Sequence, residues 1–286
     1  MSEVVDVFYS ARNLLYLGAY PQALAALASL PRSVPETERQ SLQYRAHLGQ
    51  GNAALVLSEI PATTTNATLK AIRHLAQHTP ISSEELQVDA NLQDGGFVVI
   101  AAQLLAAKNP DEALRILALH PRNIECAALT VAVYLRLNRV DLAQKLVVQL
   151  RQWSEDAPIA QLAEAWTALA AGGSAKCGEA LSAFEELAHA SSVSTARLLC
   201  SLAVTKMHLL QFQEAMGLLQ RALEMDPNDP DTLANLAICA SLTGDQEEAR
   251  PRLLTQLAHA APAHPLLKDI EFASASFDAA LAKLRA

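Results

Sequence analysis

Residues 196–229 read ARLLCSLAVTKMHLLQFQEAMGLLQRALEMDPND. Apolar residues recur at intervals of three and four in two successive blocks, which is the pattern of helices with one buried face. Small residues stand where two packed helices would cross, at Ala203 in the first block and at Ala215 and Ala222 in the second. Pro227 ends the second block. The stretch therefore predicts two short helices joined by a turn.

The length of this unit and the order of its marker residues match the tetratricopeptide repeat (TPR). Equivalent alanines recur at Ala113, Ala143, Ala180 and Ala249, at intervals that scatter around the repeat length. One such unit cannot bury its own apolar face, so several must stack. We predict an all-α fold, a TPR-like right-handed α-α superhelix (solenoid) that spans 1–286 as a single domain. The clearest repeats are expected within 94–157 and 161–263, and degenerate repeats within 1–93.

The composition supports a helical core and limits the classes of partner. Hydrophobic residues make up 51% of the chain but aromatic residues only 5%, so alanine and leucine, which are strong helix formers, must build the core. The net charge is −8, and the sequence has no cluster of basic residues of the kind that binds nucleic acid. The same acidic balance argues against direct docking on anionic lipid.

Two places depart from the repeat pattern. Between residues 61 and 94 a polar loop at 63–66 precedes two segments of helical spacing, 69–77 and 84–92, with Ser82 or Ser83 as the N-cap of the second and Glu85 or Leu86 behind it. The run Asp94-Gly95-Gly96 is expected to end that second helix. Pro251 falls within an expected helix, which is tolerable only if that helix starts late, near Arg250.

The sequence contains no motif that indicates catalysis, a cofactor or a metal. The four cysteines, Cys126, Cys177, Cys200 and Cys239, form no C-x-x-C pair and have no zinc-site spacing. His74 and His78 have the spacing of metal ligands on a helix, but no third ligand is nearby. The N-terminus lacks a secretory signal, and the longest apolar run is too short to span a bilayer. We expect a cytoplasmic protein with reduced thiols that is not an enzyme.

The concave face of a TPR array is lined by defined positions of the first helix of each repeat. In this chain those positions are mostly apolar, which suits an amphipathic helix or a folded segment of a partner. TPR cochaperones that bind an acidic C-terminal tail carry Lys, Asn and Arg there instead. The alternative is that the curvature of the superhelix buries these positions. The predicted partner-binding residues are Val98, Leu105, Ala132, Leu135, Cys200, Val204, Met207, Ile238 and Leu242.

The irregular parts of the chain resemble one particular family. Residues 44–60 (YRAHLGQGNAALVLSEI) resemble the second helical pair of the ε subunit of coatomer, and residues 161–173 (QLAEAWTALAAGG) resemble that family's segment before a double-glycine turn. The segments NPDEALRIL, DLAQK and HPLLKD are similar too, in the same order. The similarity spans nearly the whole chain. The chain departs from the family at Ala53, where the family tends to carry an aromatic residue.

This resemblance implies a cytosolic TPR-like subunit of the COPI vesicle coat, without catalytic residues. It implies binding to the C-terminal region of the coat's α subunit, stabilisation of that subunit, and a role in Golgi-to-ER retrograde and intra-Golgi transport. The location implied is cytoplasmic, peripheral on Golgi membranes and COPI vesicles, with membrane association only through the coat. The alternative function is a general TPR adaptor or cochaperone that binds a partner peptide.

Overall fold

A computed structural model describes residues 6–86, 88–154, 156–190, 194–243 and 249–285. Within these ranges all regular secondary structure is helical, which confirms the predicted all-α class. The chain divides into two compact units, Met1–Val193 (unit 1) and Ser194–Ala286 (unit 2). We describe each unit by itself, and a single continuous domain over 1–286 stays a prediction.

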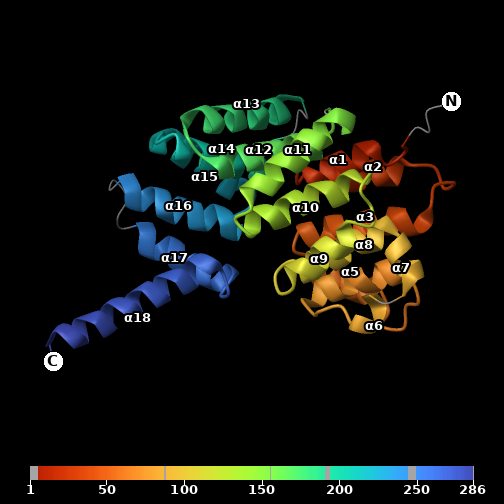
Figure 1. Cartoon of the computed structure of the whole chain (residues 1–286), viewed down its shortest axis with the longest axis horizontal. Coiled ribbons are helices and arrows are strands. Elements are labelled where there is room, and N and C mark those ends of the chain that lie inside the picture. Colours follow the sequence, from red (N-terminus) through yellow and green to blue (C-terminus); the bar gives the residue numbers. More distant parts are fainter. Residues whose placement is uncertain (1–5, 87, 155, 191–193, 244–248, 286) are drawn as a thin grey trace. The chain divides into compact units, whose positions relative to one another are not determined.

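Unit 1 consists of short helices connected by turns (Figure 1). Their bounds are α1 (Tyr9–Tyr16), α2 (Tyr20–Ser29), α3 (Glu36–Gly49), α4 (Ala53–Glu59), α5 (Ala67–Gln77), α6 (Ser83–Leu86), α7 (Asp89–Gln93), α8 (Gly95–Leu105), α9 (Pro110–Leu117), α10 (Ile124–Arg136), α11 (Val140–Ser154), α12 (Pro158–Ala171) and α13 (Ser174–Ala190).

The helices of unit 1 pack as successive hairpins. Five pairs contact one another in this way: α1 with α2, α3 with α4, α8 with α9, α10 with α11, and α12 with α13. The first helices also form a series in which each contacts the next, from α1 through α3, α5, α8 and α10 to α12. Because α1 also contacts α12, this series closes on itself into a ring of helices. The repeat pattern in the sequence did not indicate this closure.

The irregular segment between residues 61 and 94 differs in part from its prediction. Helix α5 lies where a helix was expected, but the segment 84–92 is not one helix. Two helices stand in its place: α6 begins one residue before the segment and α7 ends one residue after it. Residue 87 between them is outside the described residues. Val88 is extended and precedes α7 as its N-cap. Asp94 does end α7, but it also begins α8, because its carboxylate accepts a hydrogen bond from the Gly96 amide at 2.9 Å.

A reciprocal capping box begins α6. The Glu85 amide donates to Ser82 Oγ at 3.3 Å, and the Ser82 amide donates to Glu85 Oε2 at 3.0 Å. Two backbone groups that the helix end would otherwise leave unpaired are thereby satisfied. The predicted capping role of Ser82 with Glu85 is confirmed.

Unit 2 contains the repeat that predicted the fold. Its helices are α14 (Ala196–His208), α15 (Phe212–Met225), α16 (Pro230–Thr243), α17 (Ala249–Ala260) and α18 (Pro265–Arg285). Helix α14 pairs with α15, α16 pairs with α17, and α14 contacts α16. Ala203, Ala215 and Ala222 are completely buried, as the crossing positions require. Pro251 lies in α17, whose described part begins at Ala249. The late start expected near Arg250 adjoins residues 244–248, which lie outside the described residues.

The marker alanines are equally buried in unit 1. Ala113, Ala143 and Ala180 have no exposed surface, and they lie on α9, α11 and α13, the second helices of their pairs. Large side chains at these positions would push the paired helices apart. Ala249, the equivalent alanine on α17, is only half-buried. The repeat spacing read from the sequence therefore corresponds to the packing at Ala113, Ala143, Ala180 and Ala215.

Candidate partner-binding surfaces

An apolar strip lies on the neighbouring helices α14 and α16 of unit 2. Val204 and Met207 of α14 are half-buried against the core that contains Ala203 and Cys239. Ile238 and Leu242 lie one turn apart on α16, so they share a face of that helix, and they are 37% and 59% exposed. We call these four residues the α14–α16 strip. These are four of the residues that the sequence predicted to bind a partner, and the two helices that carry them contact each other.

Cys200 lies below this strip and not on its surface. The cysteine is buried, and its sulfur accepts a hydrogen bond from Asn235 Nδ2 of α16 at 3.5 Å. Burial raises the pKa of the thiol. Cys200 therefore joins α14 to α16, and we do not include it in the surface that a partner would contact.

The predicted residues of unit 1 lie mostly within the ring of helices. Val98 is fully buried, in the same core cluster as residues of α5 and α9, so it offers no surface to a partner. Leu105, Ala132 and Leu135 are half-buried. Leu135 packs against the cluster that also receives Tyr16 from α1. The first helix of the chain therefore contributes to the same cluster as this predicted partner-binding residue.

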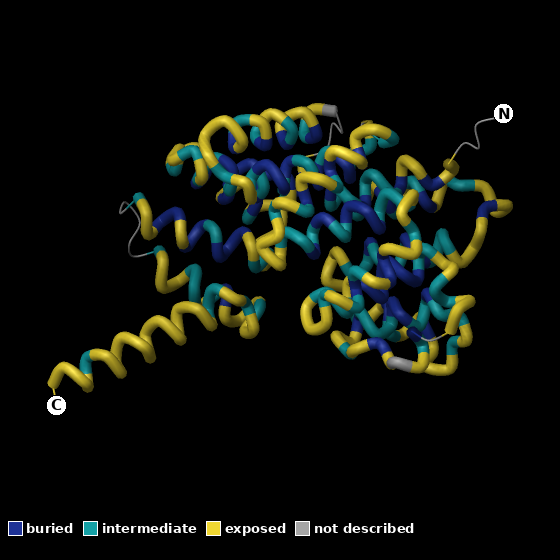
Figure 2. Tube along the Cα trace, viewed as in Figure 1, coloured by how far each residue is buried: buried dark blue, intermediate teal, exposed yellow. Residues whose placement is uncertain are grey.

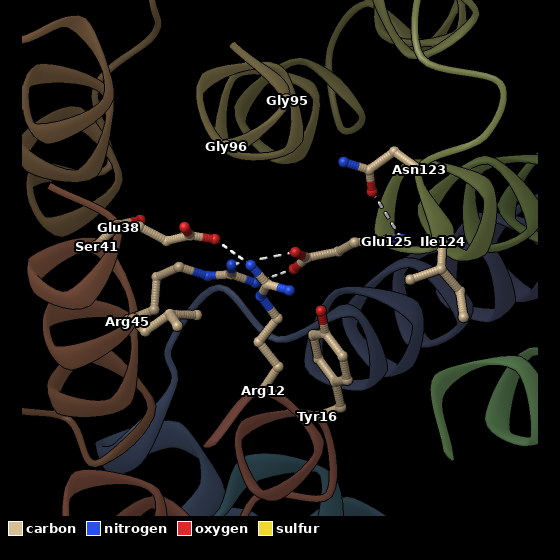
Figure 3. A pocket seen from close by; sticks show the side chains of 11 residues that line it. Arg12, Tyr16, Glu38, Ser41, Arg45, Gly95, Gly96, Asn123, Ile124 and Glu125 are labelled. Atoms are coloured by element: carbon tan, nitrogen blue, oxygen red, sulfur yellow. Dashed lines mark hydrogen bonds and ion pairs between the residues drawn. The ribbon is translucent and has the colours of Figure 1, made fainter. Parts of the chain in front are cut away.

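A polar cavity of about 290 Å³ lies inside the ring of unit 1. Figure 3 shows the side chains of Arg12, Arg45, Glu38 and Glu125 pointing toward one another, with Tyr16 beside them and Gly95 and Gly96 across the space. The lining comes from α1, α3, α8 and α10 and from the residue before α10. The lining residues are Arg12, Tyr16, Glu38, Ser41, Leu42, Arg45, Gly95, Gly96, Asn123, Ile124 and Glu125.

Both arginines of this cavity are paired with carboxylates. Arg45 of α3 forms a bidentate ion pair with Glu125 of α10, with Nη1 at 3.3 Å from Oε2 and Nη2 bonded to Oε1. Arg12 of α1 pairs with Glu38 of α3 and, at 2.5 Å, with Asp6. Three carboxylates thus surround two arginines, and neither arginine is free. A site for an acidic peptide needs basic groups that are free to pair with the ligand, so this network is better suited to holding α1, α3 and α10 together.

The environment of the cavity shifts the pKa of two of its groups. Burial raises the pKa of Tyr16 well above its ordinary value, and the negative charge of Glu125 raises it further. Burial alone would lower the pKa of Arg45, but the charge and hydrogen bonds of Glu125 outweigh that effect and raise it. Tyr16 thus stays neutral and Arg45 stays charged, as a structural network requires.

Nothing in the sequence indicated this network. The carboxylate of Glu125 and the guanidinium of Arg45 lie 80 positions apart in the chain. A repeat pattern indicates contacts within one repeat and between neighbouring repeats. It carries no signal for a contact across the ring.

The remaining chemically reactive groups have structural surroundings. Burial and the charge of Glu125 raise the pKa of the Cys126 thiol to about 12, and burial raises the pKa of Cys239. Since the thiolate is the nucleophile, neither group is activated. His74 contacts Thr79 through Nδ1 at 2.8 Å, and His78 adopts a left-handed conformation as the C-cap of α5. Among the described residues no three His, Cys, Asp or Glu side chains cluster as metal ligands would.

Helical hairpins stacked with small residues at their crossings define the class: the chain is a TPR-like α-solenoid. A solved structure of the same fold, from "Crystal structure of APC/C hetero-tetramer Cut9-Hcn1", matches 91% of this chain and 53% of its own chain with a TM-score of 0.64. Its sequence identity is only 14%, so this match speaks for the fold alone.

Sequence comparison identifies the family. The family model described as "Coatomer epsilon subunit" matches residues 4–285. The chain belongs to the coatomer epsilon subunit family, whose members are subunits of the COPI vesicle coat. It is 33% identical to coatomer subunit epsilon-1 of Arabidopsis thaliana, over 96% of each chain, and 29% identical to coatomer subunit epsilon of Caenorhabditis elegans, over 99% of this chain and 100% of that one. The resemblance seen in the irregular segments is confirmed.

Proposed function

We propose that this chain is a non-catalytic COPI subunit that binds the C-terminal region of the coat's α subunit and stabilises it. In that role it supports Golgi-to-ER retrograde and intra-Golgi transport from the cytoplasmic side of the membrane. It associates with Golgi membranes and vesicles through the rest of the coat. In the described residues no helix has both the length and the apolar character needed to cross a bilayer.

The observation that carries this proposal is the α14–α16 strip. Ile238 and Leu242 expose apolar surface on helix positions that a TPR array turns toward its partner, and Val204 and Met207 extend that surface onto α14. An apolar surface of this kind suits a stable subunit contact, since permanent interfaces resemble a domain core cut in two. In unit 1, Leu105, Ala132 and Leu135 remain secondary candidates because they are half-buried.

A non-catalytic role is consistent with the chemistry of the described residues. The thiols of Cys126, Cys200 and Cys239 have raised pKa values, and the arginines of the unit 1 cavity are paired with carboxylates. The general adaptor or cochaperone alternative requires a free basic clamp for an acidic tail. The paired state of Arg12 and Arg45 gives that alternative no support.

Co-purification tests the proposal. The tagged chain is co-expressed with the C-terminal region of the α subunit, and the recovered α subunit is measured for the wild type and for Ile238→Glu/Leu242→Glu. Both positions are exposed, so the double variant should fold normally yet lose the α subunit, because two charges would be buried in an apolar contact. Charged substitutions at Val204 and Met207 should act in the same direction.

The matched control is Val148→Glu. Val148 is 59% exposed on α11, which is the second helix of its pair and does not belong to the strip. This variant should recover the α subunit as the wild type does. Undiminished recovery with the strip variant would refute the proposed surface. Binding of a free acidic C-terminal peptide in place of the α subunit would support the adaptor alternative.

A further inference from the structure

The C-terminal helix α18 carries an apolar stripe that its own chain does not cover. Only its first turn packs on the rest of unit 2, where Leu266 and Leu267 join the cluster around Leu233 and Leu257. The rest of the helix projects from this attachment toward the C-terminus (Figure 1) and is exposed along almost its whole length (Figure 2). Phe277 and Leu284 are 67% and 85% exposed. Large apolar side chains in this state indicate a contact surface.

The stripe has the spacing of a two-stranded coiled coil. Its members follow one another at alternating intervals of four and three residues, which keeps them on one side of a helix. They are Leu266, Ile270, Ala273, Phe277, Ala280 and Leu284. Phe272 is 75% exposed but does not belong to the stripe, since it lies two positions from Ile270 and hence on the opposite side of the helix.

We propose that α18 of a second copy of this chain covers the stripe, in antiparallel orientation. In the proposed register Phe277 of one copy lies opposite Ala273 of the other, and Ile270 lies opposite Ala280. The two-fold axis that relates the copies makes each of these pairs occur twice. The four inner layers then each combine one large and one small side chain, and the two outer layers pair Leu266 with Leu284. Over the inner layers the two helices can therefore remain at an even distance. A parallel pair would instead place Phe277 against Phe277 and alanine against alanine, which alternates crowding with voids.

The charges beside the stripe favour the same orientation. Asp269 and Lys283 lie on one edge of it, each directly before a large apolar residue. Within the described part of the chain neither forms an ion pair. The antiparallel register brings Asp269 of each copy next to Lys283 of the other, which gives two opposite-charge pairs. Charges at these flanking positions are the ones that set orientation and partner choice in coiled coils.

A membrane surface fits the stripe less well than a second copy does. Membrane-surface helices carry an excess of Lys and Arg on the polar face. In α18 the basic residues Lys268, Lys283 and Arg285 are balanced by the acidic residues Asp269, Glu271 and Asp278. The free part of the stripe is about 20 Å long. A contact of this size is at the small end of protein interfaces, so the association should be weak and dependent on concentration.

Sedimentation equilibrium of the full chain over a wide range of concentration tests the proposal. The average mass should rise from that of one chain toward that of two. Phe277→Gln should weaken the association at least about tenfold because it removes the central apolar layer. Phe272→Gln should behave as the wild type does. A wild-type chain that keeps the mass of one chain throughout, or equal effects of the two substitutions, would overturn the proposal.

Charge reversal tests the register. Asp269→Lys and Lys283→Asp should each weaken self-association at least about tenfold, because each makes both flanking pairs like-charged. An equimolar mixture of the two single variants should associate again, since every flanking pair in the mixed dimer joins opposite charges. This recovery cannot arise if either variant is misfolded. A mixture that stays as dissociated as its components would refute the pairing.

A disulfide cross-link tests the orientation. Ser276 lies at the proposed two-fold axis, so Ser276→Cys should form a linked dimer under mild oxidation, whereas Ala279→Cys, on the far side of the helix, should not. The four native cysteines are buried and should not interfere. Equal linking of both variants would contradict the antiparallel pair. A membrane-binding role would also contradict it. In that case the full chain would bind vesicles of anionic phospholipid, Phe277→Gln would abolish this binding, and the chain would not self-associate.

Discussion

At the scale of single residues, Gly49 is constrained by a contact between two helices. It lies at the end of α3, against the ring of Tyr20 at the start of α2. A Cβ at this position would lie 2.3 Å from Cζ of Tyr20, which no real contact allows. Glycine lowers the stability of the helix relative to alanine, but it allows the α3 backbone to approach the Tyr20 ring closely. Gly178, within α13, has nothing within 4 Å of the position a Cβ would take.

Gly49→Ala should therefore lower the free energy of unfolding by about 1–3 kcal/mol. Gly178→Ala should raise it by up to about 1 kcal/mol, since alanine favours the helix and meets no neighbour. Urea denaturation measures both. In a Tyr20→Ala background the cost of Gly49→Ala should disappear. If the cost is the same in both backgrounds, the contact with Tyr20 is not its cause.

Glu85 makes the stability of unit 1 depend on pH. Burial alone would raise the pKa of this carboxyl, but hydrogen bonds with Lys70 and with the Ser82 amide and hydroxyl outweigh burial and lower the pKa to about 2. The folded protein thus holds the charged form more strongly than the unfolded chain does. The contribution is fully present above the ordinary value of 4.5 and is lost as pH falls from there toward about 2.

Glu85→Gln should reduce the free energy of unfolding at neutral pH by about 1 kcal/mol, because solvent screens the ion pair with Lys70, whose side chain is 44% exposed. The difference between the variant and the wild type should shrink as the pH falls below 4.5. Chemical denaturation at a series of pH values measures this difference. A difference that stays constant down to pH 2 would show that the charge of Glu85 is not responsible.

At the scale of helices, the sequence predicted those elements whose signals are local. The α14–α15 pair follows from periodicity, crossing alanines and Pro227, and the capping box at Ser82 follows from two residues three positions apart. The segment 84–92 was predicted less well, because the extended residue Val88 interrupts it without glycine or proline. The closure of α1 onto α12 could not be predicted at all, since it depends on contacts between helices that are far apart in the chain.

The crossing of α14 and α15 allows a direct test of the repeat packing. Ala215 is completely buried where these helices meet. Ala215→Leu should lower the free energy of unfolding by about 1–3 kcal/mol, because the larger side chain forces the helices apart. Gln220→Leu, at an exposed position of the same helix, should have little effect. An unchanged melting temperature for Ala215→Leu would be incompatible with a close crossing.

At the scale of the folded units, the sequence indicated which helix face would bind a partner but not how much of it was free. In unit 2 the strip is accessible at Ile238 and Leu242. In unit 1 the ring of helices buries Val98, and the network of Arg45 with Glu125 occupies part of the interior. Repeat positions give the direction of a side chain, whereas exposure depends on how the superhelix curves.

The Arg45–Glu125 pair should stabilise this closed arrangement of unit 1. Its side chains are only 13% and 16% exposed. Glu125→Ala would leave Arg45 buried without its partner and should cost about 2–5 kcal/mol in urea denaturation. The double variant Arg45→Met/Glu125→Leu should cost clearly less than the single change. A double variant that costs as much as the two single changes added together would show that the residues do not act as a pair.

The central claim is that the α14–α16 strip binds the C-terminal region of the coat's α subunit. Titration calorimetry of the purified partner into the full chain measures it most directly. We predict tight binding with a negative heat capacity change, the signature of apolar burial, for the wild type and for Val148→Glu. We also predict an affinity at least about a hundredfold lower for Ile238→Glu/Leu242→Glu. Equal affinities of all three proteins would contradict this claim.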